Sequence, residues 1–153
     1  MVIAFFHFIR IKILLIAFLV YLHNSINSIM QKIFVEATNS TPQVKFDESG
    51  RLSLIGRSLI LNVNEFYKPL IDWLRQLNTP VVRFTIEFDY FNSGSSKMIL
   101  EMLKVIDSNN NVRDFDVFWH FEKDDEDILE IGQIFEERLR KAKFYFREYA
   151  ESA

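Results

Sequence analysis

The sequence contains no cysteine, which excludes disulfides, thiolate nucleophiles and zinc–cysteine sites. Its four glycines form no glycine-rich phosphate loop. Basic residues are also few: 18 Lys and Arg stand against 21 Asp and Glu, and the formal net charge of -3 gives no broad positive surface for nucleic acid. We therefore expect no cofactor, no metal and no nucleic-acid partner.

Hydrophobic residues are abundant, at 49% of 153 residues, and 15% of the chain is aromatic. A chain of this length and composition can bury one packed core. The composition therefore predicts one folded domain and makes a disordered chain implausible.

Residues 1–29 form a separate hydrophobic segment, interrupted by Arg10 and Lys12. The uninterrupted apolar run, Ile13 to Leu22, is shorter than the roughly 20 residues that a membrane helix needs. Its length and the basic residues before it suit a signal peptide, but no A-x-A-like cleavage site follows. Three interpretations stay open: translation that begins at Met30, an uncleaved membrane anchor, and a signal peptide.

The choice affects the chemistry of the domain at 30–153. A start at Met30 removes His7 and His23, so His120 becomes its single histidine. It also removes two basic residues and no acid, which makes the remaining chain more acidic. We expect this domain to be cytoplasmic, or membrane-anchored if residues 1–29 are retained.

From Ile33 onward the pattern alternates between strands and helices. Strands are expected at 33–37, 44–46, 51–56, 81–91, 116–121 and 143–146. Helices are expected from Asn62 or Asn64 to about Leu77, from Ser96 to Ser108, and from Asp124 to about Ala142. Gly50, in the turn at 47–50, suits a positive φ, and Pro69 should kink the first helix or make its first turn irregular. This order predicts a single α/β domain with a mixed sheet and packed helices.

Apolar periodicity also predicts the buried positions. They are Phe66, Leu70, Trp73, Leu74 and Leu77; Phe84, Ile86, Phe88 and Tyr90; Met98, Ile99, Met102, Leu103 and Ile106; and Ile128, Ile131, Phe135 and Leu139.

The stretch DYFNSGSSKMIL, residues 89–100, places an unusual number of hydroxyls where a strand leads into a helix. Asn92, Ser93, Ser95 and Ser96 are all good helix N-caps, because their side chains accept from free N–H groups of the first turn. One of these hydroxyls could instead accept a phosphate, which the positive end of the helix dipole tolerates. Both interpretations stay open from the residues alone.

Other polar groups give weaker hypotheses. The acidic run at 122–127 could bind a hard cation, but acids in a first helical turn are explained by the helix dipole. His120 lies in an apolar strand, without a serine or acid placed to complete a triad, so we expect it to be buried or half-buried. Nothing in the sequence indicates an enzyme.

Four ordered segments resemble the SiaC family of bacterial regulatory phosphoproteins: ATNSTPQV, GRSLILNVNEFYKPLIDWL, EFDYFNSGSSKMILEMLKVI and WHFEKDDEDILEIGQIFEERL. The resemblance covers nearly everything from about Phe34 to Phe146 and leaves 1–29 outside. The resemblance implies a domain comparable to the STAS anti-sigma-factor antagonists.

The resemblance also implies a non-enzymatic switch. A Ser/Thr kinase would phosphorylate the protein, and a PP2C-like phosphatase would remove the phosphate. The unphosphorylated form would bind a diguanylate cyclase and promote cyclic-di-GMP synthesis. The acceptor follows the asparagine of a YFN corner, which is Ser93 here. Asn92, Gly94, Ser95 and Ser96 would form the switch loop and helix cap. Ser93 stands where the family pattern has threonine, and Gly94 where it has serine.

The exposed surface of the helix from Ser96 to Ser108 is the expected partner face. An alternative, based on the hydrophobic N-terminal segment, is a membrane-tethered adaptor or structural protein without a phospho-switch.

Overall fold

The computed structural model describes residues 30–150. The strands are β1 (Ile33–Val35), β2 (Gln43–Phe46), β3 (Arg51–Ser58), β4 (Val81–Phe91), β5 (Asp114–Glu122) and β6 (Ala142–Tyr149). The helices are α2 (Val63–Arg75), α3 (Ser93–Ser108) and α4 (Glu126–Glu136). The predicted anchor, signal peptide and alternative start concern residues 1–29, outside this range. No helix within 30–150 is long and apolar enough to cross a membrane.

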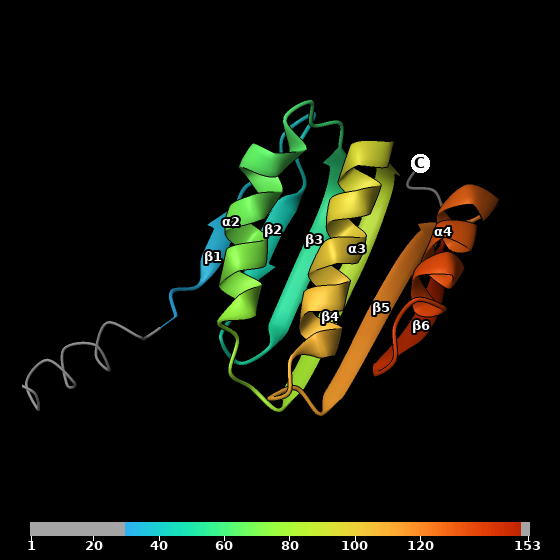
Figure 1. The fold of residues 1–153 in the computed structure, drawn as a ribbon. Helices are drawn as coiled ribbons and strands as arrows, with labels where there is room; N and C mark the ends of the chain where they lie inside the picture. Colours follow the sequence, from blue (N-terminus) through green and yellow to red (C-terminus); the bar gives the residue numbers. More distant parts are fainter. Residues whose placement is uncertain (1–29, 151–153) are drawn as a thin grey trace, which may run out of the picture. The chain divides into compact units, whose positions relative to one another are not determined.

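The six strands form one mixed sheet in the order β1-β2-β3-β4-β5-β6. The first three strands are antiparallel neighbours, and β3 to β6 run parallel to one another. A right-handed crossover between adjacent parallel strands always places its helix on the same face. Accordingly, α2, α3 and α4 all cover one face of the sheet (Figure 1). The predicted α/β class and mixed sheet are confirmed.

The core lies between the helices and the face of the sheet that they cover. Its fully buried side chains include Phe46, Phe84, Phe115, Trp119, Tyr67, Leu74 and Met102. Trp73 lies 5.5 Å from Phe46 between ring centroids, and the Trp119 indole donates a hydrogen bond to the Ile128 carbonyl at 3.0 Å. Both tryptophans are therefore core residues, as predicted for Trp73.

The predicted burial of Tyr90 is wrong, because its side chain is 53% exposed. The β3–β4 pairing shifts register here: Gly56 pairs with Phe88, but Arg57 pairs with Tyr90. The extra residue, Asp89, forms a bulge, which reverses the alternation of faces. Phe91 is buried in place of Tyr90.

The third helix is shorter than predicted and the last strand longer. Helix α4 ends at Glu136, so Leu139 lies outside it and is only half-buried, while β6 begins at Ala142. Helix α2 runs through Pro69 without interruption from Val63 to Arg75. The predicted stripes otherwise hold, although Phe66, Met98 and Ile131 are half-buried.

Candidate functional site

The serine corner lies where β4 ends and α3 begins, beside the loop that joins β3 to α2. Asn92 joins these segments through four hydrogen bonds. Its backbone N–H donates to the Ser58 carbonyl at 3.0 Å, and its side-chain amide donates to the Ile60 carbonyl at 3.0 Å. These two bonds attach the corner to the end of β3.

The other two bonds cap α3. The Asn92 side-chain oxygen accepts from the Ser95 N–H at 2.8 Å, and its carbonyl accepts from the Ser96 N–H at 2.9 Å. An α-helix leaves its first four N–H groups without helical partners. Of these four, the N–H groups of Ser93 and Gly94 have no hydrogen-bond acceptor within the part of the chain that the structure describes. Asn92 is thus the cap of α3, one of the four residues at 92–96 that were cap candidates.

The corner serines differ in accessibility. Ser95 is completely buried, Ser96 is half-buried, and Ser93, the first residue of α3, is exposed. A kinase needs to reach the hydroxyl that it modifies, so the fold makes Ser93 the most accessible of the three. The first turn of α3 contains no acidic residue to oppose an added phosphate.

The Ser95 hydroxyl belongs to a buried network that sequence reasoning missed. It donates to the Ser58 carbonyl at 3.3 Å and accepts from the Ser58 hydroxyl at 2.7 Å. The Tyr67 hydroxyl lies 2.7 Å from the Ser58 hydroxyl. Because the Ser58 hydroxyl already donates to Ser95, Tyr67 is the donor in this pair. Burial raises the pKa of Tyr67 above its ordinary value, which keeps the phenol protonated. The network connects α2, β3 and the first turn of α3, which Ser93 begins. Ser58 could have been noticed as a polar residue on the buried face of β3.

Replacing Tyr67 by phenylalanine should lower the free energy of unfolding by about 1–2 kcal/mol, because the Ser58 hydroxyl loses a buried donor. Urea denaturation of Tyr67→Phe checks this value. The matched control is Tyr145→Phe, which removes the hydroxyl of a tyrosine that is 43% exposed and should change stability by under about 0.5 kcal/mol. Equal effects of the two substitutions would contradict a structural role for the network.

Gly94 occupies the second position of α3 and has a negative φ, unlike Gly50 and Gly56. A Cβ atom built on Gly94 would lie 3.2 Å from Cγ1 of Val63, the first residue of α2. The glycine therefore lets the starts of the two helices approach closely beside Ser93.

Exposed apolar side chains flank the corner, and these were also missed. Leu61 is fully exposed and Leu59 is 41% exposed, in the loop whose Ile60 carbonyl binds Asn92. The apolar run at 59–61, placed between a strand and a helix, was the available clue. Apolar side chains that are exposed together can form part of a protein-binding surface.

The remaining candidates contribute nothing to this site. Asp125 caps α4 by accepting from the Ile128 N–H at 3.0 Å, and two further acids occupy the first turn, as the dipole argument predicts. No group of three or more potential ligands that could hold a metal ion occurs among residues 30–150. His120 is half-buried, with Nδ1 3.8 Å from a carboxylate oxygen of Glu87.

Fold and site together define a small α/β domain that presents an ordered, serine-bearing helix N-terminus. Comparison with known proteins gives the family. Residues 35–149 match the SiaC family regulatory phosphoproteins, and the chain belongs to that family. It is a SiaC-family regulatory protein, as the resemblance of the four segments implied.

A relative matches most of the chain, and solved structures share its fold. An uncharacterized protein of Pseudomonas aeruginosa (strain UCBPP-PA14) is 28% identical over 114 residues, which cover 71% of this chain and 90% of the relative. The crystal structure of apo-SiaC from Pseudomonas aeruginosa has a TM-score of 0.64 at 24% identity and covers 79% of this chain and 100% of its own. SiaC in complex with diguanylate cyclase SiaD, of which it is the activator, gives a TM-score of 0.61 at 24% identity, covering 78% and 99%.

Proposed function

We propose that the protein is a cytoplasmic, non-enzymatic switch in which Ser93 is phosphorylated by a Ser/Thr kinase and dephosphorylated by a PP2C-like phosphatase. The unphosphorylated form binds and activates a diguanylate cyclase, and so promotes cyclic-di-GMP synthesis. The observation that carries the proposal is the position of Ser93: it is the exposed serine at the start of a capped helix.

Physical chemistry supports a phosphate at this position. The positive end of the helix dipole and the free N–H groups of the first turn favour a dianion, so the fold tolerates the modification. The buried network of Ser58, Tyr67 and Ser95 holds the first turn of α3 against β3 and α2. Phosphorylation therefore changes the charge of the surface by about -1.5 to -2 without refolding the domain.

The partner surface in this proposal is the outer side of α3 together with the exposed leucines of the β3–α2 loop. Lys97, Glu101 and Lys104 are exposed along α3, and Leu61 supplies an apolar anchor near its start. A phosphate at the edge of a complementary interface weakens it through repulsion and desolvation. The relative in complex with SiaD is a precedent for a cyclase as the partner.

The test is the affinity of three variants for the cognate diguanylate cyclase, measured by calorimetry. We expect Ser93→Ala to bind like the unmodified protein, and Ser93→Glu to bind at least roughly ten-fold more weakly. Ser49→Glu makes the same change at an exposed serine in the β2–β3 turn, at the opposite end of β3, and should bind normally.

Equal binding by Ser93→Ala and Ser93→Glu would refute the switch. Intact-mass measurement with fragment mapping on protein from its native host provides the second check. We expect a single phosphoryl group on Ser93. A phosphoryl group on Ser96 instead would make Ser96 the phosphoacceptor.

A further inference from the structure

The face of the sheet opposite the three helices, which we call the open face, carries Phe34, Lys45, Ser53, Thr85 and Phe118. No helix of residues 30–150 covers it (Figure 1). Parallel strands are normally covered on both faces, and β3 to β6 are parallel. Residues 30–150 thus form two layers where a parallel sheet usually has three.

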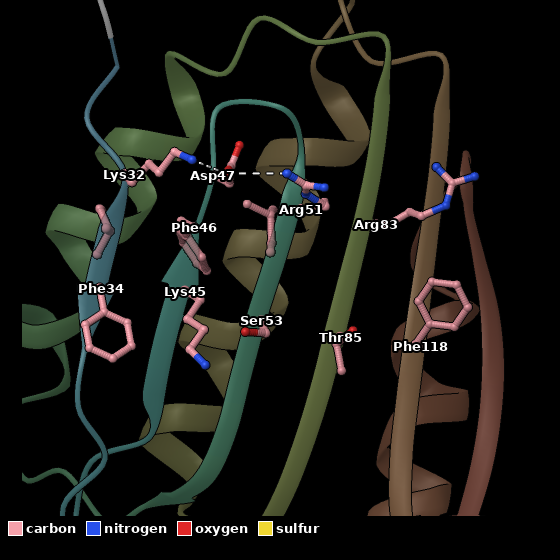
Figure 2. Close-up of a pocket in the computed structure, with 12 residues that line it drawn as sticks. Lys32, Phe34, Lys45, Phe46, Asp47, Arg51, Ser53, Arg83, Thr85 and Phe118 are labelled. Atoms are coloured by element: carbon pink, nitrogen blue, oxygen red, sulfur yellow. Dashed lines mark ion pairs between the residues drawn. The ribbon is translucent and has the colours of Figure 1, made fainter.

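A single row of paired residues crosses the open face. In strand order it consists of Phe34, Lys45, Ser53, Thr85, Phe118 and Tyr145. The two short side chains, Ser53 and Thr85, occupy the middle, and aromatic rings stand at both ends (Figure 2). This arrangement makes a trough of about 560 Å³ over β3 and β4.

The walls of the trough are ordered by their own contacts. Phe118 stacks on Tyr145 with 5.3 Å between ring centroids, and the Arg147 guanidinium lies 5.3 Å from the Phe118 centroid. On the opposite wall, the Lys45 ammonium lies 5.7 Å from the Phe34 centroid. Phe34 is nevertheless 57% exposed, so apolar surface remains uncovered.

The trough has the width of one α-helix. From β1, which carries Phe34, to β5, which carries Phe118, there are four strand spacings, or roughly 19 Å. An α-helix with its side chains is about 10–12 Å across, and the aromatic walls take up much of the difference. A helix that follows β3 and β4 would rest on Ser53 and Thr85.

The lining is positively charged although the whole chain is acidic. Among the described residues, the lining contains four basic side chains, those of Lys32, Lys45, Arg51 and Arg83, and one acidic side chain, that of Asp47. Asp47 lies 2.8 Å from the Lys32 ammonium and 3.9 Å from the Arg51 guanidinium (Figure 2), and the bond from Lys32 lowers the pKa of this carboxyl. Arg83 also has an acidic neighbour outside the lining, Asp116, at 3.6 Å. The balance still favours an occupant with negative charge.

We propose that the open face binds an acidic amphipathic helix of a partner protein, with its small and apolar side chains over Ser53 and Thr85 and its carboxylates toward Lys45 and Arg83. This surface is separate from the Ser93 corner, which begins a helix on the covered face. The inference therefore does not depend on the phospho-switch.

A synthetic helical peptide of roughly 14 residues tests the proposal, since this length spans about 21 Å of trough. One side of the peptide carries Glu and the other Leu and Ala, and its binding to the full chain is followed by fluorescence anisotropy. We expect saturable binding, and at least roughly ten-fold weaker binding of the same peptide with Lys in place of Glu.

Variants locate the binding site. Ser53→Trp fills the trough and Lys45→Glu reverses a charge, and each should weaken acidic-peptide binding at least roughly ten-fold. Lys123→Glu, the same charge change at an exposed lysine of the β5–α4 loop, should bind the peptide as tightly as the unaltered protein. Lys45 is exposed, so Lys45→Glu keeps the test valid if Ser53→Trp fails to fold.

Three results would overturn the proposal: no binding of the acidic peptide, equal binding of both peptides, or unchanged binding by Ser53→Trp and Lys45→Glu. A different result would assign the trough to a second copy of this chain: the protein self-associates, Ser53→Trp dissociates it, and it does not bind the peptide. Ser93→Glu should bind the peptide as tightly as the unaltered protein. Peptide binding therefore tests the open face separately from the phospho-switch at Ser93.

Discussion

Replacing Asp107 by alanine should lower the free energy of unfolding by about 3–5 kcal/mol, because it removes a buried charge that three backbone donors share. The Asp107 side chain accepts hydrogen bonds from the backbone N–H groups of Arg140 at 3.0 Å, Lys141 at 2.7 Å and Ala142 at 3.0 Å. The residue is only 9% exposed, so water cannot replace the carboxylate well.

This carboxylate joins segments that are far apart in the sequence. Asp107 lies at the end of α3, and its three donors lie where the chain enters β6. Lys141 strengthens the same junction, since its ammonium donates to the carbonyls of Asn109 at 2.7 Å and Val112 at 3.0 Å. Loss of Asp107 would therefore free the edge strand as well as the helix end.

Urea denaturation of Asp107→Ala measures the effect. Asp114→Ala is the matched control, because it removes an exposed carboxylate at the start of β5 and should cost under about 0.5 kcal/mol. Asp107→Asn keeps one acceptor oxygen and should fall between the two. A cost for Asp107→Ala no larger than that of the control would contradict the proposed junction.

A comparably large loss is expected for Gly50→Ala. Gly50 has φ +89°, which an L side chain rarely adopts, and a Cβ atom built there would lie 2.1 Å from the Val81 carbonyl oxygen. Backbone strain of about 1–3 kcal/mol and a collision of similar size together predict a cost of about 3–5 kcal/mol.

Gly56→Ala separates the two causes. Gly56 also has a positive φ, +113°, but a Cβ atom there would meet nothing within 4 Å. Its substitution should therefore show the strain alone, about 1–3 kcal/mol. Thermal unfolding of both variants decides the matter, and equal losses would mean that the contact with Val81 relaxes at no cost.

Local patterns predicted most of the fold. Alternation in β4 located Phe84, Ile86 and Phe88 in the core, and a glycine in a turn at 47–50 correctly indicated a positive φ. These predictions succeeded because each depends on neighbours in the sequence. The prediction that Tyr90 is buried failed because the bulge at Asp89 arises from pairing with β3, more than 30 residues earlier.

The predicted end of α4 was wrong for a related reason. Leu139 continues the helical spacing of Ile131 and Phe135, so the local pattern predicts a helix through this point. Asp107 instead takes the N–H groups of residues 140–142 from a position 33 to 35 residues away. A competing partner so distant leaves no mark on local periodicity.

The candidate site shows the same division. Residues 89–100 predicted that a helix cap lies among Asn92, Ser93, Ser95 and Ser96, because capping is local, and the structure shows Asn92 in this role. The difference between exposed Ser93 and buried Ser95 did not follow, because Ser95 is buried by a hydroxyl network that reaches Ser58, 37 residues earlier. The role of Ser93 as phosphoacceptor stays a prediction until modification is measured.

The order of the strands has a consequence for synthesis on the ribosome. Because β1 to β6 are neighbours in the sheet in the order in which they are translated, each new strand meets a partner that has already emerged. No strand has to be inserted between two that are already paired, and each crossover closes a short loop before the next begins. The domain can therefore be assembled progressively from one edge during translation, with β6 added last and secured by Asp107.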